Sequence, residues 1–333
     1  MKPKIAFFEL EDWEKKYIKK SLKGYQLIFF DELNKNSIKK IKDCEILCIF
    51  IYSDITKQVL DDLPKLKLIT TRSTGFDHIN LDECKKKNIT VCNVPYYGAN
   101  TVAEHTFALI LNLTRRIHKA YEKTVRGDFS LDGLRGFDLR GKSIGIVGCG
   151  NIGIHVARIA KGFEMNVFVF DLKKDEKLAK KLGFEYANLN TLLKKSDIVT
   201  LHVPYNKFTH HLINKNNINL FKKGAIIINT SRGGLVETDA LVRALRKGTI
   251  GGAGLDVLEE EGLIREESQL LSKKYTNKML ATLLENHILL KMDNVIVTPH
   301  NAFNSKEALI RILDTTIEDI KSFWKGKTKN IVK

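Results

Sequence analysis

The 333-residue sequence has few cysteines and no pattern that would join them. It holds five, an odd number without a CxxC pair, which excludes a disulfide framework and gives no sign of a zinc site. We therefore expect no metal. Cys48 and Cys92 lie in apolar runs and are expected to be buried thiols. Cys149 lies in a glycine-rich turn, where a small space-filling role is favoured over a redox role.

Long apolar runs are also missing. No run approaches the roughly 20 residues that cross a bilayer, and the apolar run near the N-terminus is too short for a secretory signal. Hydrophobic residues make up 43% of the chain, which is typical of a globular protein, and the length fits two domains of ordinary size. We expect a cytoplasmic protein with no membrane partner.

Acidic residues are too few to balance the basic ones. There are 55 Lys and Arg against 39 Asp and Glu, which gives a net charge of +16. Such a charge suits nucleic-acid binding, which would be steeply salt-dependent. The lysines are nevertheless spread along the chain, without a basic tail or a strip of basic and aromatic residues. We therefore expect a lysine-rich surface that attracts anionic substrates, and no nucleic-acid partner.

Strand and helix signals alternate along the chain, without repeats or low complexity. The expected helices include 13–22, 82–87, a long one at 101–125, one within 260–293, and a last one at 305–325. The expected strands are 4–8, 26–30, 45–50, 67–71, 90–94, 143–147, 167–170, 198–203, 225–229, 250–255 and 295–298. Alternation of this kind predicts an α/β protein with two doubly wound parallel-sheet domains. The last helix is expected to return to the first domain, because chain ends are often close together.

The most informative stretch is Gly148-Cys149-Gly150-Asn151-Ile152-Gly153. It follows an apolar run, opens a helical pattern, and is followed by a second apolar run that ends in Asp171. This is the complete βαβ dinucleotide fingerprint, in which the glycines allow a tight turn and the helix N-terminus binds phosphates. Asp171 would accept hydrogen bonds from the ribose hydroxyls and repel a 2′-phosphate, which predicts NAD rather than NADP.

Polar residues follow three later strands at their carboxyl ends, where ligands bind in such sheets. They are Arg232, the acidic run 259–261, and His300. Each has a plain interpretation: a surface arginine, a solvated acidic face and a core histidine. Beside an NAD site they fit one chemistry, because a guanidinium binds a carboxylate bidentately and a histidine, oriented by an acid, passes a proton to a carbonyl oxygen. The product would be a 2-hydroxy acid.

These residues lie in stretches that resemble the D-isomer-specific 2-hydroxyacid dehydrogenases over nearly the whole chain. The stretches are 72–79 (RSTGFDHI), 100–105 (NTVAEH), 148–153, 202–204 (HVP), 229–233 (NTSRG), 252–257 (GAGLDV) and 298–300 (TPH). The resemblance implies a Rossmann NAD-binding domain, residues 100–303, and a discontinuous, flavodoxin-like substrate domain, residues 1–99 and 304–333. It also implies a hinged cleft that closes to exclude water, and a homodimer formed through the NAD domain.

The resemblance also assigns roles to single residues. Arg232 would hold the substrate's carboxylate and carbonyl, and His300 would be the acid/base, paired with Glu261. Backbone N–H groups of Thr74 and Gly75 would bind the substrate carboxylate, and the side chains of Tyr97 and Phe303 would wall the site. The residues that contact the cofactor would be Thr101, Gly148, Gly150, Asn151, Ile152, Gly153, Asp171, Val203, Pro204, Thr209, Thr230, Ser231, Arg232 and Asp256, the last at the nicotinamide carboxamide.

Tyr97, Phe303 and the long segment 260–293 are similar to the D-lactate branch of the family. An aromatic wall suits the methyl group of pyruvate, so we expect reduction of pyruvate to D-lactate, although Gly98-Ala99 replaces a more usual Ser-Pro. A hydroxypyruvate, glyoxylate or 2-ketoisocaproate reductase is an alternative, because one methylene changes discrimination by only about 1–3 kcal/mol. A non-catalytic NAD-sensing protein is another; the lack of disordered tails at either end argues against it.

Overall fold

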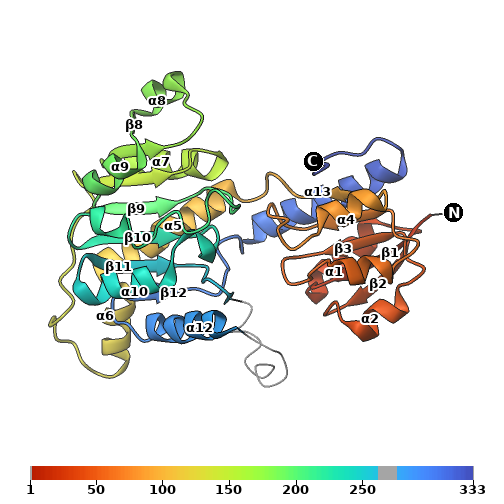
Figure 1. The fold of residues 1–333 in the computed structure, drawn as a ribbon, viewed down its shortest axis with the longest axis horizontal. Helices are drawn as coiled ribbons and strands as arrows, with labels where there is room; N and C mark the ends of the chain where they lie inside the picture. Colours follow the sequence, from red (N-terminus) through yellow and green to blue (C-terminus); the bar gives the residue numbers. More distant parts are fainter. Residues whose placement is uncertain (1, 262–275, 333) are drawn as a thin grey trace. The chain divides into compact units, whose positions relative to one another are not determined.

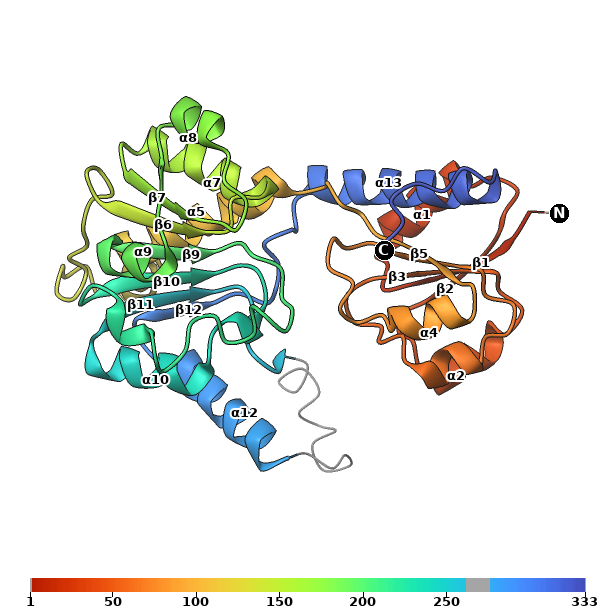
Figure 2. The same ribbon diagram turned by 45° about the horizontal axis from the view of Figure 1, so that its top comes forward.

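The computed structural model describes residues 2–261 and 276–332. The chain divides into two compact units, Met1–Tyr97 with Ser305–Lys333, and Gly98–Asn304. The domain boundaries expected from the sequence, after residues 99 and 303, stay a prediction. Each unit is built around one parallel sheet, with five strands in the first and seven in the second (Figures 1 and 2). The prediction of two doubly wound α/β units is confirmed.

The five-stranded sheet has the strand order β2-β1-β3-β4-β5, so the direction of winding reverses between β1 and β3. Its strands read as continuous apolar runs because helices cover both faces. The helices on one face are α2 (Lys35–Lys40), α3 (Lys57–Asp61) and α4 (Leu81–Lys86). The strands are β1 (Lys4–Phe8), β2 (Gln26–Phe30), β3 (Ile46–Ile49), β4 (Leu68–Thr71) and β5 (Thr90–Cys92).

The other face of this sheet is covered by helices from both ends of the chain, α1 (Asp12–Ser21) and α13 (Lys306–Trp324). Leu313, Ile317 and Ile320 of α13 pack in one buried cluster with Ile5 and Phe7 of β1. Burying a side chain of this size contributes about 1.5–3 kcal/mol. The last helix therefore completes the core of the unit that the first residues begin, as the sequence predicts.

The seven-stranded sheet has the order β12-β11-β10-β9-β6-β7-β8, with the reversal between β6 and β9. The helices on one face are α5 (Ala99–Arg115), α7 (Asn151–Gly162) and α8 (Glu176–Leu182). The other face carries α9 (Leu189–Lys195), α10 (Thr238–Lys247), α12 (Asn277–Leu290) and the 3₁₀ turn η1 (Ile218–Leu220). The strands are β6 (Ser143–Val147), β7 (Asn166–Phe170), β8 (Glu185–Tyr186), β9 (Ile198–Leu201), β10 (Ala225–Asn229), β11 (Ile250–Leu255) and β12 (Val295–Val297).

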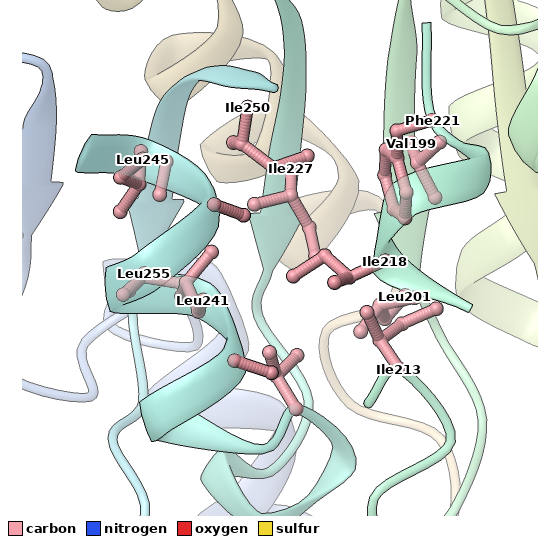
Figure 3. Close-up of a cluster of buried hydrophobic side chains, with 14 of the residues drawn as sticks. Val199, Leu201, Ile213, Ile218, Phe221, Ile227, Leu241, Leu245, Ile250 and Leu255 are labelled. Atoms are coloured by element: carbon pink, nitrogen blue, oxygen red, sulfur yellow. The ribbon is translucent and has the colours of Figure 1, made fainter. Parts of the chain in front are cut away.

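Helix α10 is strongly amphipathic and fixes the strands that lead into the candidate site. Figure 3 shows Leu241 and Leu245 of this helix beside Ile227 of β10 and Ile250 and Leu255 of β11. All five side chains are buried. Because β10 and β11 are held in a close-packed core, the turns that follow them start from a rigid base.

The long helix expected at 101–125 is wrong as a single element. It is two helices, α5 and α6 (Ile117–Val125), separated by Arg116 in the left-handed conformation at φ +55°. The Asn112 side chain accepts the His118 N–H at 2.9 Å, which satisfies a donor in the first turn of α6. The apolar spacing continues across the break and therefore could not show it.

The remaining expected elements agree with the structure. All eleven expected strands occur with ends within two residues of the prediction, and only the two-residue β8 was missed. Helix α12 confirms the helix expected within 260–293, of which residues 262–275 lie outside the described residues. Cys48 and Cys92 are buried free thiols, and burial raises the pKa of each to about 12. No described helix is both long and apolar enough to cross a membrane.

Candidate active site

The glycine-rich loop joins β6 to α7 at the carboxyl edge of the seven-stranded sheet. Gly148 has φ +98°, and a Cβ there would lie 2.6 Å from the carbonyl oxygen of His202. A Cβ on Gly153 would lie 2.1 Å from the carbonyl oxygen of Gly148, so only glycine lets α7 begin this close to the strand. A Cβ on Gly150 would meet no atom within 4 Å. Two glycines therefore serve the chain's own packing, while the third leaves open space beside the loop.

The start of α7 offers backbone donors beside this space. Its N-cap is Gly150, which has no side chain to accept a hydrogen bond from Asn151, Ile152 or Gly153. The first N–H groups of a helix have no partner within the helix, and the helix dipole adds partial positive charge at the same end. This end of the loop fits a phosphate group.

Asp171 follows β7 and is fixed against the glycine loop. One carboxylate oxygen accepts the Cys149 N–H at 2.7 Å, and the other accepts the Lys173 N–H at 2.9 Å. This carboxylate lies where a ribose is bound in the fingerprint, so the residues present fit a dinucleotide with a free 2′-hydroxyl. Burial, with the nearby Asp171 and Asp175, raises the pKa of the Cys149 thiol to about 11. The thiol is protonated at neutral pH, which supports its interpretation as a small filling residue.

The segment after β9 forms a closed turn. Thr209 donates its hydroxyl to the Pro204 carbonyl at 2.7 Å and accepts the Asn206 N–H at 2.8 Å. Val203 packs beside the glycine loop, because a Cβ on Gly148 would lie 2.9 Å from its Cγ1. Thr209 thus shapes the turn, and the predicted cofactor contacts of these residues stay predictions.

The turn after β10 carries Arg232 and is braced by Asn229. The Asn229 side chain donates to the Arg232 carbonyl at 2.9 Å and accepts the Ser231 N–H at 3.1 Å. Ser231 donates its hydroxyl to the Leu201 carbonyl at 2.8 Å. Thr230 is joined at 3.2 Å to Thr106 of α5, the helix whose first turn holds the buried Thr101. The turn is therefore tied to β9 and to α5, and the half-buried Arg232 donates locally to the Ser231 carbonyl at 2.9 Å.

His300 and Glu261 are brought together at the same edge, 39 residues apart in sequence. The imidazole Nδ1 lies 2.7 Å from Glu261 Oε1, and the His300 backbone is left-handed at φ +53°. Because a carboxylate only accepts, Nδ1 must donate its proton to Glu261. No group of residues 2–261 or 276–332 hydrogen-bonds to Nε2. The ring is oriented through one nitrogen while the other can exchange a proton with a ligand.

Asp256 clamps the turn that presents His300. Its carbonyl accepts the His300 N–H at 2.8 Å, and its carboxylate accepts the N–H groups of Asn301 and Ala302 at 3.0 and 2.8 Å. The Thr298 hydroxyl also donates to this buried carboxylate, and His105 Nε2 lies 3.5 Å from it. Burial alone raises the pKa of Asp256, but these donors hold it below its ordinary value, so the carboxylate is ionised.

His105 is a contributor that the sequence analysis did not assign. It lies one helical turn after Thr101 on α5, and its Nε2 reaches both Asp256 and the Thr298 hydroxyl at 3.2 Å. The spacing of four residues on one helix face was the available signal. It became informative only once β11 and β12 were placed beside α5.

Three of the predicted substrate residues belong to the five-stranded unit. Thr74 follows β4 and donates its hydroxyl to the Val94 carbonyl at 2.8 Å, and Ser73 donates to the Gly75 carbonyl at 2.6 Å. The Tyr97 carbonyl accepts a bond from Arg311 of α13. Phe303 lies in the other unit, half-buried and three residues after His300. Contact of these four residues with a substrate stays a prediction.

Known proteins are similar to this chain in sequence and fold. The model of the family "D-isomer specific 2-hydroxyacid dehydrogenase, NAD binding domain" matches residues 107–302. The chain is 37% identical over 333 residues to D-lactate dehydrogenase of Escherichia coli, with 98% of each chain covered. It is 35% identical over 298 residues to glyoxylate reductase of Thermococcus litoralis, covering 87% of this chain and 83% of that one. The structure of D-lactate dehydrogenase from Aquifex aeolicus with NAD and lactic acid matches with a TM-score of 0.88 and 39% identity, covering 97% and 96%.

Proposed function

The chain belongs to the D-isomer-specific 2-hydroxyacid dehydrogenases, which makes it an oxidoreductase with NAD as its cofactor, and we propose that it reduces pyruvate to D-lactate. The observation that carries the proposal is the His300–Glu261 pair, in the same unit as Arg232 and the NAD loop. The likeness to two D-lactate dehydrogenases at 37% and 39% identity supports pyruvate as the substrate.

Each catalytic side chain has one task. The Arg232 guanidinium binds the carboxylate of the keto acid through charge-assisted hydrogen bonds. The doubly protonated His300 ring donates its Nε2 proton to the carbonyl oxygen. Glu261 accepts the Nδ1 proton, which holds the ring in place and stabilises its positive charge. When bound, NADH supplies the hydride for the carbonyl carbon.

The residues that would hold the cofactor surround the glycine loop. The N-terminus of α7 would bind the pyrophosphate, and Asp171 the adenine ribose. The segment 203–209, with Thr101, Thr230, Ser231 and Asp256, would line the remainder. Asp256 would have two tasks, because its oxygens already accept bonds from the His300 turn.

Tyr97 and Phe303 would set the choice of keto acid. Two aromatic rings suit a methyl group, and their removal would admit longer chains at little cost. Glyoxylate is the competing substrate, since a glyoxylate reductase is 35% identical to this chain.

A panel of keto acids tests the proposal. NADH oxidation would be followed with pyruvate, glyoxylate, hydroxypyruvate and 2-ketoisocaproate, with NADPH as the cofactor control and the chirality of the product assigned. We expect the highest kcat/KM with pyruvate and NADH, and D-lactate as product. Preference for another keto acid would leave the family assignment unchanged and would make that acid the substrate. Tight NADH binding without any turnover would overturn the proposal in favour of an NAD-sensing protein.

The proposal includes a homodimer formed through the NAD-binding unit; the cytoplasmic location remains a prediction. Ile117, Tyr121 and Val125 of α6 are 54%, 69% and 68% exposed, which is unusual for large apolar side chains on one helix. The first two line a hollow of about 600 Å³ together with Leu111 of α5. A second copy would cover this face. Sedimentation should give a dimer for the native chain and a monomer for Tyr121→Glu; a native monomer would contradict the assembly.

A further inference from the structure

A second histidine–carboxylate pair lies beside the first. In the acidic run 259–261, which the sequence suggests is a solvated face, the Glu259 side chain is only 13% exposed. Its Oε1 lies 2.7 Å from His211 Nε2, and its Oε2 accepts the Thr238 hydroxyl at 2.7 Å. Both oxygens are thus engaged by groups far away in sequence, which is unlike a solvated acid.

The side-chain partners of Glu259, His211 and Thr238, lie on two segments that backbone hydrogen bonds join. Backbone bonds join the segment after β9 to the turn after β10: His211 N–H to the Gly234 carbonyl at 2.8 Å, Ile213 N–H to the Leu235 carbonyl at 3.0 Å, and Glu237 N–H to the Ile213 carbonyl at 2.9 Å. Residues 211–238 include both of these segments. We call this range the arginine body, because Arg232 lies within it.

Glu259 itself belongs to the turn that carries Glu261. Its carbonyl accepts a bond from Asn286 of α12 at 2.7 Å, and the Leu258 N–H donates to Glu261 at 3.4 Å. This turn packs directly on the arginine body, since a Cβ on Gly233 would lie 2.0 Å from the Leu258 carbonyl carbon. The Glu259 carboxylate adds side-chain hydrogen bonds to His211 and Thr238 across this contact.

We propose that Glu259 and His211 form a positioning pair that aligns Arg232 with Glu261 and His300 during reduction of the keto acid. The inference rests on the proposed function and says how Arg232 is held in position relative to Glu261 and His300. Arg232 holds one end of the substrate while Glu261 orients the proton donor at the other. A misplacement of about 1 Å between such groups costs on the order of a hundredfold in rate.

The pair should act mainly on alignment, because the groups expected to bind the pyrophosphate and adenine ribose of NADH are separate from it. The glycine loop, α7 and Asp171 follow β6 and β7, and none of them bonds to Glu259 or His211 among the hydrogen bonds of the described residues. The backbone bonds within the arginine body also survive removal of the Glu259 carboxylate. Loss of the pair should therefore change kcat and the KM for the keto acid while leaving the Kd for NADH in place.

The chain offers a matched control for each partner. Glu260 is exposed and next to Glu259, and His210 stacks on His211 with ring centroids 3.8 Å apart but bonds to the Tyr205 hydroxyl instead. The test compares Glu259→Gln and His211→Gln with Glu260→Gln and His210→Gln. Thr238→Val and Thr238→Ser remove and keep the hydroxyl that bonds to Glu259.

Three quantities are measured on the full chain: steady-state kinetics with the best keto acid, the Kd for NADH by fluorescence, and the Kd for oxamate, a non-reducible pyruvate analogue, in the presence of NADH. We expect Glu259→Gln and His211→Gln to lower kcat/KM about tenfold to a hundredfold and to weaken oxamate binding, with the NADH Kd within about twofold of wild type. Thr238→Val should lower kcat/KM and oxamate affinity by less than these two variants do, and Thr238→Ser should keep both at wild-type values.

The inference is overturned if the Glu259 and His211 variants match their controls, or if NADH binding and stability to urea fall as much as activity. Should those two variants fail to fold, equal values for Thr238→Val and Thr238→Ser overturn it. A wild-type chain that reduces no keto acid refutes the proposed function. In that case the inference is judged only by whether the Glu259 and His211 variants bind oxamate more weakly than their controls.

Discussion

The carboxyl edges of the two sheets each carry an arginine close after a strand, yet the two arginines do different work. Arg72, after β4, is only 3% exposed; it pairs with the buried Glu14 at 3.1 Å and donates to the Phe8 and Glu9 carbonyls. Arg232, after β10, is half-buried in a turn braced by Asn229. Position at the edge is therefore insufficient to mark a binding arginine. Nearly complete burial marks Arg72 as the structural one.

The largest effect should come from Arg232. Replacing it by Ala removes the charged donor for the substrate carboxylate, a loss of about 2–5 kcal/mol in transition-state binding, so kcat/KM should fall about a thousandfold. Urea unfolding should be unchanged. Arg243→Ala, which breaks an exposed pair with Asp239, is the control. If Arg232→Ala were about as active as this control, Arg232 would not be a substrate-binding arginine, and the contrast with Arg72 would be wrong.

Arg72 tests the structural side. Arg72→Ala leaves Glu14, which is 5% exposed, without its counter-charge, and we expect a loss of about 3–5 kcal/mol of unfolding free energy in urea. Burial already raises the pKa of Glu14 against the opposing effect of Arg72. The double variant Arg72→Met with Glu14→Leu should recover most of the loss. A single variant as stable as wild type would show that this arginine is not structural.

Asp171 has both a structural role and an expected cofactor-binding role, and we expect a smaller effect from its replacement. Its carboxylate supports the Cys149 N–H and is placed for a ribose. Asp171→Asn should weaken NADH binding about tenfold, since a hydrogen bond to a charged group contributes about 1.5–3 kcal/mol, and should narrow the preference over NADPH by removing the repulsive charge. Fluorescence titration with both cofactors measures this. An unchanged NADH to NADPH ratio would contradict the assignment.

Asp319 of α13 is a buried acid, and its effect should appear as a change of stability with pH. It is 0% exposed, Asn330 donates to it at 2.8 Å, and burial raises its pKa to about 7. The protonated form is favoured in the folded state, so its contribution to stability is full below about pH 4 and is lost as the pH rises through about 7. Relative to Asp319→Asn, the wild type should be less stable in urea at pH 8 than at pH 5. A constant difference between the two proteins would contradict the pKa shift.

Local patterns predicted much of this molecule. Buried parallel strands are short apolar runs, and the dinucleotide loop needs glycine where Gly148 and Gly153 meet backbone atoms. Such signals are contained within a few neighbouring residues. Arg232, His300 and the acidic run 259–261 were predicted as candidates because strand ends in parallel sheets converge on one edge, and the family resemblance singled out Glu261 within that run.

The remainder depended on contacts between distant segments. Glu259 is indistinguishable from Glu260 in sequence, and only the approach of His211 and Thr238 separates them. His105 acquires its partner only when β11 lies beside α5. The helix break lies at the left-handed Arg116 and is accompanied by a hydrogen bond to the Asn112 side chain, and a hydrophobic period registers neither feature.

The packing of α13 on β1 has a consequence for synthesis of the chain. Leu313, Ile317 and Ile320 are made only after the whole seven-stranded unit, residues 98–304. At about 5–20 residues per second, the part of this sheet face that α13 covers therefore stays exposed for about 10–40 s on the ribosome, with only α1 packed beside it. The seven-stranded unit can complete its core during that interval. The unit that is begun first is therefore finished last.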